Sequence, residues 1–242
     1  MSLAVHVAQP TSADMGTVEM LRAAGVGAGD EVIVSAYGNA EVAEAVVEAG
    51  AMPVFADIDP DTYCLSLEAV AAGVTSRTAA VVAVHRFGRH AEVAGLRELG
   101  ERHGLLVLER HEDEQHSQDQ GGLERRRAHA AYLSGRLSGV ITPAGGAGHT
   151  YEQYVVRVPG NGRPDRDAFA RAVRAKGVDC RVPVKTPVHR MPRFWRDVAL
   201  PETERAADET LALPVDASMS RRELQRVVSA CNALGGLLQP AF

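Results

Sequence analysis

Short apolar segments alternate with amphipathic segments through the first half of this 242-residue sequence, and this alternation restricts the fold more than any other feature. Apolar runs such as 31–35 and 79–84 are typical of strands that are covered on both faces. The segments between them have helical spacing and end at glycine, as at Gly25 and Gly50. Strands that alternate with helices predict right-handed crossovers and a mainly parallel sheet, so the expected fold class is α/β.

The pattern gives each expected element approximate bounds. A strand near Leu108 is the last one before the pattern stops, and Asn39 is the expected cap of the second helix. The predicted strands are 3–8, 31–35, 53–56, 79–84 and 105–108, and the predicted helices are 14–24, 39–48, 67–73 and 92–103.

The regular alternation of apolar and amphipathic segments stops by Gly122, which predicts a domain boundary there. Residues 1–122 form the expected large α/β domain, and residues 123–242 form a connecting helix and a small C-terminal α+β domain. Ser220 and Glu223 have the spacing of a capping box at the last helix. The elements expected in this half are helices 123–137, 166–176, 201–211 and 221–234 and strands 155–158 and 178–184.

Composition excludes several classes of partner. A net charge of −5 argues against a nucleic-acid-binding protein. No segment approaches the roughly 18 consecutive apolar residues of a membrane span. The three cysteines lie far apart, without the spacing of a zinc site or a disulfide framework. We therefore expect a cytoplasmic protein with no nucleic-acid or membrane partner.

Several long stretches resemble one family of enzymes. Residues 49–63 read AGAMPVFADIDPDTY, and segments 29–34, 84–88 and 103–109 flank them in the same order. Together with 149–159, 187–189 and 204–214, they closely resemble the DegT/DnrJ/StrS-type sugar aminotransferases. The resemblance implies a fold type I enzyme that uses pyridoxal phosphate, and a dimer with active sites at the subunit boundary.

The positions that hold the cofactor in this family differ here. Arg110 stands where the family has the aspartate that binds the pyridinium nitrogen, and Asn39 stands where an aromatic side chain stacks on the ring. Ser12-Ala13-Asp14 replaces the Ser-Gly-Thr segment that binds the phosphate, and Asp14 would repel that anion. The resemblance therefore implies a member that has lost its cofactor.

The lysine that forms the Schiff base is also absent from its expected place. The sequence contains only Lys176 and Lys185, so residues 1–175 hold none. The family's lysine-bearing segment is missing between His116 and Leu123, which implies a truncated member. Lys185, four residues before His189, could reach a cleft, but a solvated lysine is the simpler interpretation.

Acidic and histidine side chains gather where the strand near Leu108 ends. Ligands of open α/β sheets bind beyond the carboxyl ends of parallel strands. A histidine beside a carboxylate can transfer protons near neutral pH, so the catalytic candidates are Glu109, His111 and His85. Asp113 and His116 follow on the same segment, and His90 follows His85. The alternative interpretation is a solvated loop.

Metal binding is not predicted. The five-residue spacing of His111 and His116 matches no known ligand pattern, and the turn that contains Asp57, Asp59 and Asp61 is expected to be structural. Candidate ligand-binding residues come from the aligned pocket of the family, although packing or capping is the alternative for Tyr37, Tyr63, Arg89 and His189. The full candidate set is Tyr37, Asn39, Arg89, Arg110, Lys185 and His189.

Two functions from different classes fit these residues. The first is a binding or helper protein in sugar or natural-product biosynthesis, which holds a small metabolite or pairs with an active paralogue. The second is an enzyme that works without pyridoxal phosphate and uses Glu109 and the nearby histidines. A remnant without function is a third. Because a missing segment would leave an edge or face of the sheet uncovered, we expect a homodimer.

Overall fold

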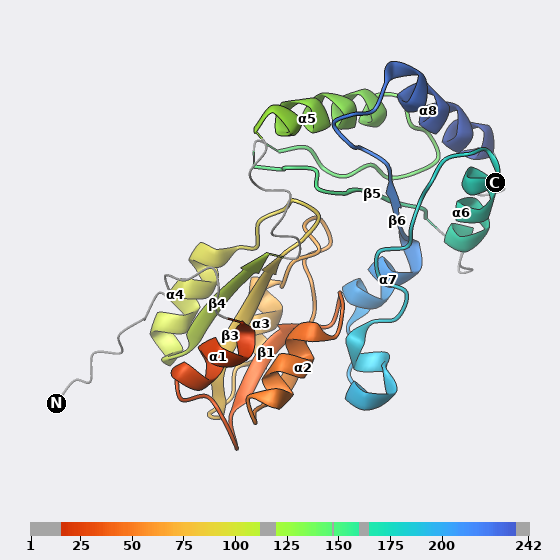
Figure 1. The fold of residues 1–242 in the computed structure, drawn as a ribbon. Helices are drawn as coiled ribbons and strands as arrows, with labels where there is room; N and C mark the ends of the chain where they lie inside the picture. The colour runs from red at the N-terminus through yellow and green to blue at the C-terminus, as the bar shows by residue number, and fades with distance from the viewer. Residues whose placement is uncertain (1–15, 112–119, 147, 160–164, 236–242) are drawn as a thin grey trace.

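The computed structural model describes residues 16–111, 120–146, 148–159 and 165–235 (Figure 1). Its centre is a four-stranded parallel sheet in the order β2-β1-β3-β4. The strands are β1 (Glu31–Ser35), β2 (Met52–Ala56), β3 (Thr78–His85) and β4 (Leu106–His111). The predicted α/β class is therefore confirmed. The predicted strand 3–8 lies outside the described residues.

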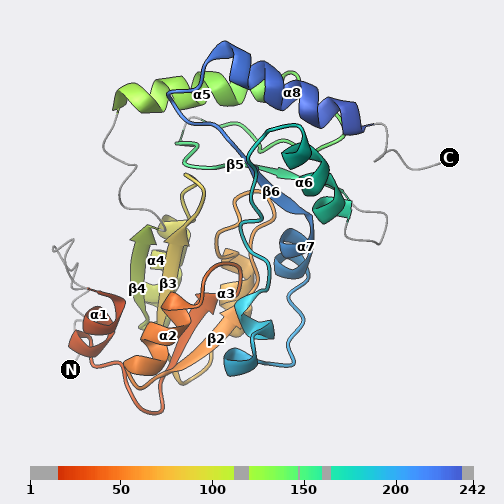
Figure 2. The same cartoon turned by 45° about the vertical axis from the view of Figure 1, so that its right-hand side comes forward.

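Helices cover both faces of this sheet (Figures 1 and 2). On one face, α1 (Thr17–Ala23) and α2 (Glu41–Glu48) share a core with Val32 and Val34 of β1. On the other face, α3 (Leu67–Gly73) and α4 (Val93–His103) share a core with Ile33. Neighbouring strand residues thus point to opposite cores, which explains why the strands read as continuous apolar runs.

The connections leave β1 and β3 in opposite directions, although these two strands are neighbours. The chain leaves β1 for α2 on one face, and it leaves β3 for α4 on the other. This arrangement is the topological switch point of an open α/β sheet, where ligands bind beyond the carboxyl ends of the strands. The ends of β1, β3 and β4 are therefore the places to search for a site.

The second half of the chain builds a separate core around a two-stranded antiparallel sheet of β5 (Tyr154–Arg157) and β6 (Thr210–Leu213). Three helices pack on it: α5 (Gln120–Ser134), α6 (Asp165–Ala175) and α8 (Arg221–Gly235). Ser220 Oγ and Glu223 form the predicted capping box at the start of α8. None of the described helices has the length and apolar character needed to cross a membrane.

Two predictions for this half were wrong. The helix expected over 201–211 ends earlier, because α7 (Pro201–Glu209) gives way to β6, whose Leu211 and Leu213 enter the core. Helix-forming residues before Leu211 suggested a continuous helix, and pairing with β5 overrides that preference. The strand expected over 178–184 is reduced to one bridge, between Arg181 and Ala212.

A segment of the second half returns to the large sheet. Val188 of the short helix η1 (Val188–Arg190), Phe194 of η2 (Pro192–Phe194) and Leu200 belong to the same core as Phe55 of β2. The rings of Phe55 and Phe194 meet edge to face at 6.4 Å. The core of the large sheet is therefore built from both halves of the sequence.

Asp57, directly after β2, fixes the start of α7. Its carboxylate accepts hydrogen bonds from Glu202 N (3.0 Å), Thr203 N (2.8 Å) and Thr203 Oγ1 (2.7 Å). Asp59 accepts from the amides of Asp61 and Thr62 within its own turn. These contacts agree with the structural role expected for the Asp-Ile-Asp-Pro-Asp turn.

We expect Asp57→Ala to lower the free energy of unfolding by about 1–2 kcal/mol, because the first amides of α7 lose their acceptor. Urea unfolding followed by circular dichroism measures this change. Asp61→Ala is the control, since the Asp61 side chain is exposed. Equal destabilisation by both substitutions would contradict the capping role.

Candidate functional site

The predicted carboxylate and histidines come together at the carboxyl ends of β3 and β4. In the parallel ladder Ala83 pairs with Glu109 and His85 pairs with His111, so Glu109 and His111 point to the same face as His85. Glu109 Oε1 lies 2.8 Å from His85 Nε2, and Glu109 Oε2 lies 2.9 Å from Arg97 Nη2 of α4. Each oxygen of Glu109 thus faces a donor.

Glu109 and His111 lie inside the strand, because β4 runs to His111 and does not end at Leu108 as predicted. Pairing with the last residues of β3 keeps the polar end of the strand extended. Arg110 falls on the opposite face of the sheet and is half-buried. Asp113 and His116 lie outside the described residues.

The protonation state of His85 follows from its two hydrogen bonds. The Ala91 amide donates to His85 Nδ1 at 2.9 Å, so Nδ1 carries the lone pair and Nε2 carries the proton that it donates to Glu109. His85 is 5% exposed, and burial lowers its pKa while the Glu109 hydrogen bond opposes that shift. Neutral His85 therefore orients Glu109 and has no free nitrogen for a ligand.

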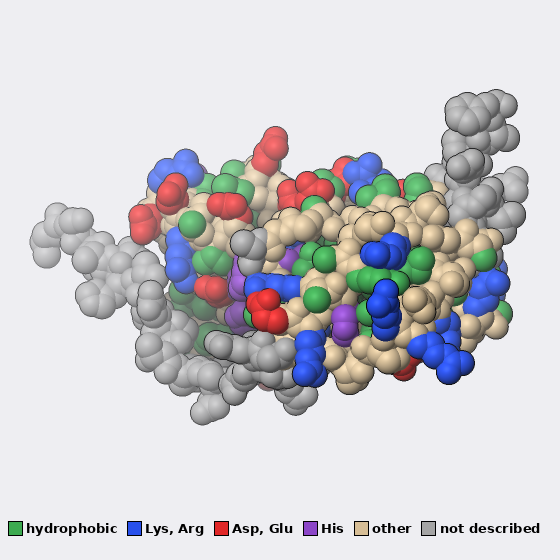
Figure 3. Space-filling view, turned by 90° about the horizontal axis from the view of Figure 1, so that it is seen from above, with side chains coloured by type: hydrophobic (Ala, Val, Ile, Leu, Met, Phe, Trp, Pro, Cys, Tyr) green, Lys and Arg blue, Asp and Glu red, His purple; other side chains and the backbone are tan. Residues whose placement is uncertain are grey.

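Two further histidine rings border His85. His90 meets it edge to face at 5.0 Å, and His111 lies 4.4 Å from it between ring centroids. Both outer histidines are exposed, as is Glu109 at 37% of its side chain. Figure 3 shows histidine side chains at the surface beside basic and acidic ones. Glu109, His111 and His90 are thus the groups of this cluster that solvent or a ligand can reach.

The same cluster has the spacing of a metal site but not its chemistry. Ligand atoms of His85, Glu109 and His111 lie within 4.8 Å of one another. His85 would have to bind through Nε2, which is protonated while Nδ1 accepts the Ala91 amide. Metal binding there would require an imidazolate or the loss of that hydrogen bond. The absence of a metal centre stays a prediction.

The structure does not gather the six predicted ligand-binding residues into one set. Tyr37 is fully buried, its hydroxyl lies 2.8 Å from Thr210 Oγ1, and its ring stacks on Tyr63. His189 is fully buried, with Nε2 3.2 Å from Glu204 Oε1. These two side chains pack inside the protein, in agreement with the alternative interpretation that they are packing residues.

The other four candidates are accessible to different degrees, and one of them, Arg110 of β4, is half-buried. Asn39 is exposed just before α2 and does not cap it, because the helix begins one residue later and its N-cap is Ala40. Lys185 is exposed on the segment between α6 and η1. Arg89 is half-buried, and its guanidinium donates to Ala144 O. Their role in binding stays a prediction.

Sequence reasoning missed Arg86 and Gly38, which lie at the switch point. Arg86, directly after β3, is 3% exposed, and its guanidinium carbon lies 5.9 Å from the centre of the Tyr37 ring. That guanidinium occupies the space next to Gly38, where even a single added methyl group would collide with it. In the sequence, Gly38 is the feature that could have indicated this close approach. The buried guanidinium of Arg86 thus lies against Tyr37 and Gly38, the residues that follow β1.

The sequence matches one family model, described as the DegT/DnrJ/EryC1/StrS aminotransferase family, over residues 3–121 and again over 118–232. The two matches meet at residues 118–121, inside the stretch where a family segment was predicted to be missing. This break and the shortness of the chain relative to its relatives are consistent with an internal truncation.

Individual relatives point the same way. The chain is 37% identical over 171 residues to "L-glutamine:2-deoxy-scyllo-inosose aminotransferase" of Streptomyces fradiae, an alignment that covers 70% of this chain but only 37% of that protein. It is 27% identical over 299 residues to a "Pleiotropic regulatory protein" of Geobacillus stearothermophilus, covering 86% of this chain and 79% of that one. The latter alignment is longer than this chain, so residues of that relative have no counterpart here.

Solved structures share the fold. DesV of S. venezuelae, in complex with a ketimine intermediate, superposes with a TM-score of 0.79 at 23% identity, over 90% of this chain and 82% of that one. The aminotransferase TlmJ of Streptoalloteichus hindustanus superposes with a TM-score of 0.80 at 22% identity, over 93% and 84%. At these identities the likeness establishes the fold alone.

Proposed function

Because the chain belongs to the DegT/DnrJ/EryC1/StrS aminotransferase family, we propose that it keeps the family's fold without transamination and acts as a binding or helper protein in small-molecule biosynthesis. The observation that carries this proposal is the absence of any lysine before Lys176. Without a lysine at the sheet, the aldehyde of pyridoxal phosphate has no amine with which to form a Schiff base.

The geometry of the switch point agrees with loss of the cofactor. Buried Arg86 lies beside Gly38, which follows β1, and Arg110 stands where the family binds the ring nitrogen. A guanidinium in place of that aspartate cannot stabilise a protonated pyridine nitrogen, because like charges repel. Exposed Asn39 offers no aromatic surface for stacking. The residues present therefore do not fit pyridoxal phosphate.

The relatives suggest the class of molecule that such a protein would hold. Their names include aminotransferases that act on 2-deoxy-scyllo-inosose, a polyhydroxylated ring. This chain spans 37% of the first of them, so transfer of that substrate to it is part of the proposal. We propose a sugar-like or cyclitol-like ligand, a cytoplasmic location, and a homodimer or a complex with an active paralogue.

Loss of the cofactor is directly testable. We expect purified protein to be colourless, and titration with pyridoxal phosphate to give no saturable imine absorbance band, because the two lysines of the sequence, Lys176 and Lys185, are both exposed to solvent. Lys185→Ala and the matched control Lys176→Ala should leave the spectra unchanged. A saturable band that Lys185→Ala abolishes and Lys176→Ala keeps would restore the transaminase interpretation.

One observation favours the alternative of an enzyme that works without pyridoxal phosphate. Glu109 is held on both oxygens, by His85 Nε2 and by Arg97, and its side chain is partly open to solvent. Such an array fixes a carboxylate for proton transfer. Because both nitrogens of His85 are engaged, the exchangeable proton would have to pass between a ligand and Glu109 or His111.

A further inference from the structure

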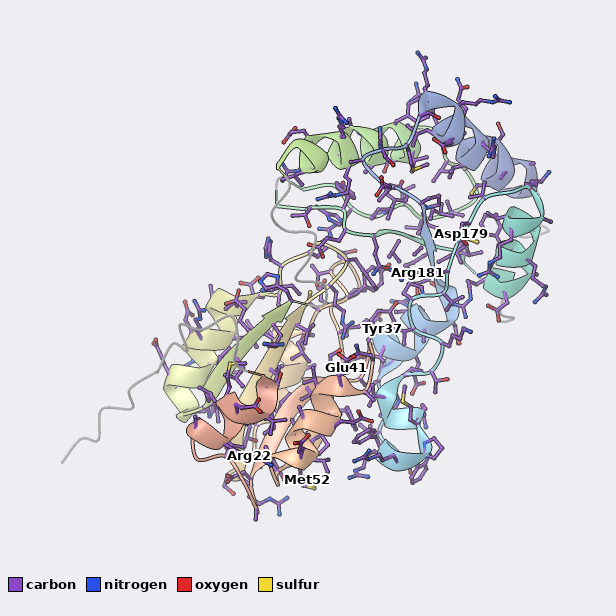
Figure 4. All side chains as sticks on the ribbon, in the orientation of Figure 1. Arg22, Tyr37, Glu41, Met52, Asp179 and Arg181 are labelled. Atoms are coloured by element: carbon purple, nitrogen blue, oxygen red, sulfur yellow. The ribbon has the colours of Figure 1, made fainter. Side chains whose placement is uncertain are left out.

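A second place for a ligand lies in the C-terminal half, in a cavity that contains no residue of β3 or β4. A cavity of about 230 Å³ opens beside the β5–β6 ladder, among the start of α5, the residues before β5, the segment after α6 and the end of β6. Figure 4 labels Asp179 and Arg181 on the segment after α6. The polar and charged residues that line the cavity are Arg126, Glu152, Gln153, Asp179, Arg181 and Asp216.

Arg126 of α5 is the unusual member of this lining. It is 8% exposed, and its Nε donates to Thr150 O at 3.1 Å. Within the described parts of the chain, no carboxylate forms an ion pair with it. Arg166, which is similarly buried, donates to Ala207 O and Thr210 O and pairs with Asp167. Arg126 thus keeps a charge inside the protein with far fewer partners.

Arg126 lines the cavity, and within the described residues only its Nε has a hydrogen-bond partner. A buried charge without a counter-charge is costly and is rarely kept without a use. A guanidinium presented in this way binds a carboxylate through two parallel hydrogen bonds.

Carboxylates line the same cavity. Asp179 is exposed and Glu152 is half-buried, and Glu152 Oε1 accepts a hydrogen bond from Thr150 Oγ1 at 3.1 Å. The cavity therefore offers a cation to a negative group and acceptors to a positive group. At roughly 30 Å³ per water molecule it would hold about eight waters, which is below the size of pockets for drug-sized ligands. It suits a small molecule that carries both charges.

We propose that this cavity binds a small zwitterion of the amino-acid type, with its carboxylate on Arg126 and its ammonium group between Asp179 and Glu152. The cavity contains none of the residues at the ends of β1, β3 and β4. The proposal therefore does not depend on the loss of transamination, and either can fail without the other.

Isothermal titration calorimetry of the full chain with three matched probes tests the proposal. L-alanine carries both charged groups, propionate carries only the carboxylate, and ethylamine carries only the ammonium group. We expect saturable binding of L-alanine, with propionate and ethylamine at least about tenfold weaker, because each loses one charge-assisted contact. Asp179→Asn should weaken L-alanine and leave propionate unchanged.

Substitutions on α5 identify the residue responsible. Arg126→Met should weaken L-alanine by about tenfold or more, whereas Arg125→Met, a change at the exposed neighbouring residue, should have no effect. Because Arg126→Met also removes the bond to Thr150 O, Arg126→Lys serves as a second variant that keeps the charge and loses the bidentate geometry. It should bind with intermediate affinity.

Three results would overturn the proposal. The first is the absence of saturable L-alanine binding to the unmodified chain at millimolar concentration. The second is L-alanine affinity in Arg126→Met and Arg126→Lys equal to that of Arg125→Met. The third is equal affinity for propionate and L-alanine, which would leave the acidic residues without a role.

Discussion

Replacing Gly88 by alanine is expected to lower the free energy of unfolding by about 2–5 kcal/mol, a large effect for a single methyl group. Gly88 follows β3 with φ of +86°, and an added Cβ would lie 2.7 Å from Tyr151 N and 2.9 Å from Glu152 N. Both atoms belong to the backbone of the second half, so they cannot turn aside as a flexible side chain can. The left-handed backbone strain and the collision therefore both lower the free energy of unfolding where the two halves meet.

Gly104→Ala is the matched control for this experiment. Gly104 ends α4 with a similar φ of +70°, but nothing lies within 4 Å of an added Cβ. The Gly104→Ala substitution should lower the free energy of unfolding by only the left-handed strain, about 1 kcal/mol. Urea unfolding of both variants separates the cost of the left-handed backbone from the cost of the collision with residues 151 and 152. An equal loss in both would mean that the approach of Gly88 to residues 151 and 152 contributes nothing.

Tyr37→Ala is expected to cost about 3–5 kcal/mol, the range for truncating a buried aromatic side chain. Tyr37 is fully buried against Tyr63 and Phe87, with ring centroids at 5.7 and 6.2 Å. Tyr37→Phe keeps the ring and loses the hydrogen bond to Thr210, so it should cost about 1 kcal/mol. Thermal and urea unfolding of the two variants measure the difference.

The same pair of variants separates packing from ligand binding. If Tyr37 packs, stability falls steeply with Tyr37→Ala and slightly with Tyr37→Phe. If Tyr37→Ala instead unfolds like the unmodified chain, the ring does not stabilise the core. That result would contradict the packing role of Tyr37 and return it to the ligand-binding candidates.

The sheet could be predicted from the sequence because burial on both faces leaves a distinct pattern. The strand over 31–35 and the helix over 67–73 have the predicted bounds, and the helix over 92–103 differs by one residue. Continuous Val and Ile runs occur where two helix layers cover a strand, and left-handed Gly104 ends its helix. Local chemistry and tertiary packing favour the same structure in these segments.

In the smaller sheet, β5 was predicted to within one residue, but β6 was missed because local preference and packing disagree there. Residues before Leu211 favour a helix, yet Leu211 and Leu213 enter the core only when this segment pairs with β5. The two strands are 53 residues apart at their closest paired ends, Arg157 and Thr210. Such pairing depends on contacts that no local window of the sequence contains.

The candidate site shows the same division. His85, Glu109 and His111 could be placed together because they end neighbouring strands of one parallel sheet. Arg97 and the Ala91 amide could not, although they hold Glu109 and set the proton of His85. They come from α4 and the turn before it, and nothing in their spacing marks them as partners of Glu109 on β4 and His85 on β3. Hydrogen-bond roles therefore had to come from the structure.

The return of Val188, Phe194 and Leu200 to the large sheet affects how this chain can fold during synthesis. N-terminal domains usually fold first as the chain leaves the ribosome. Here the face of the sheet that carries Val32, Val34 and Phe55 lacks part of its cover until residue 200 has emerged. The exposed apolar surface would persist while most of the second half is translated. Ribosome-bound chains stalled before residue 188 should therefore depend on chaperones more than chains stalled after residue 200.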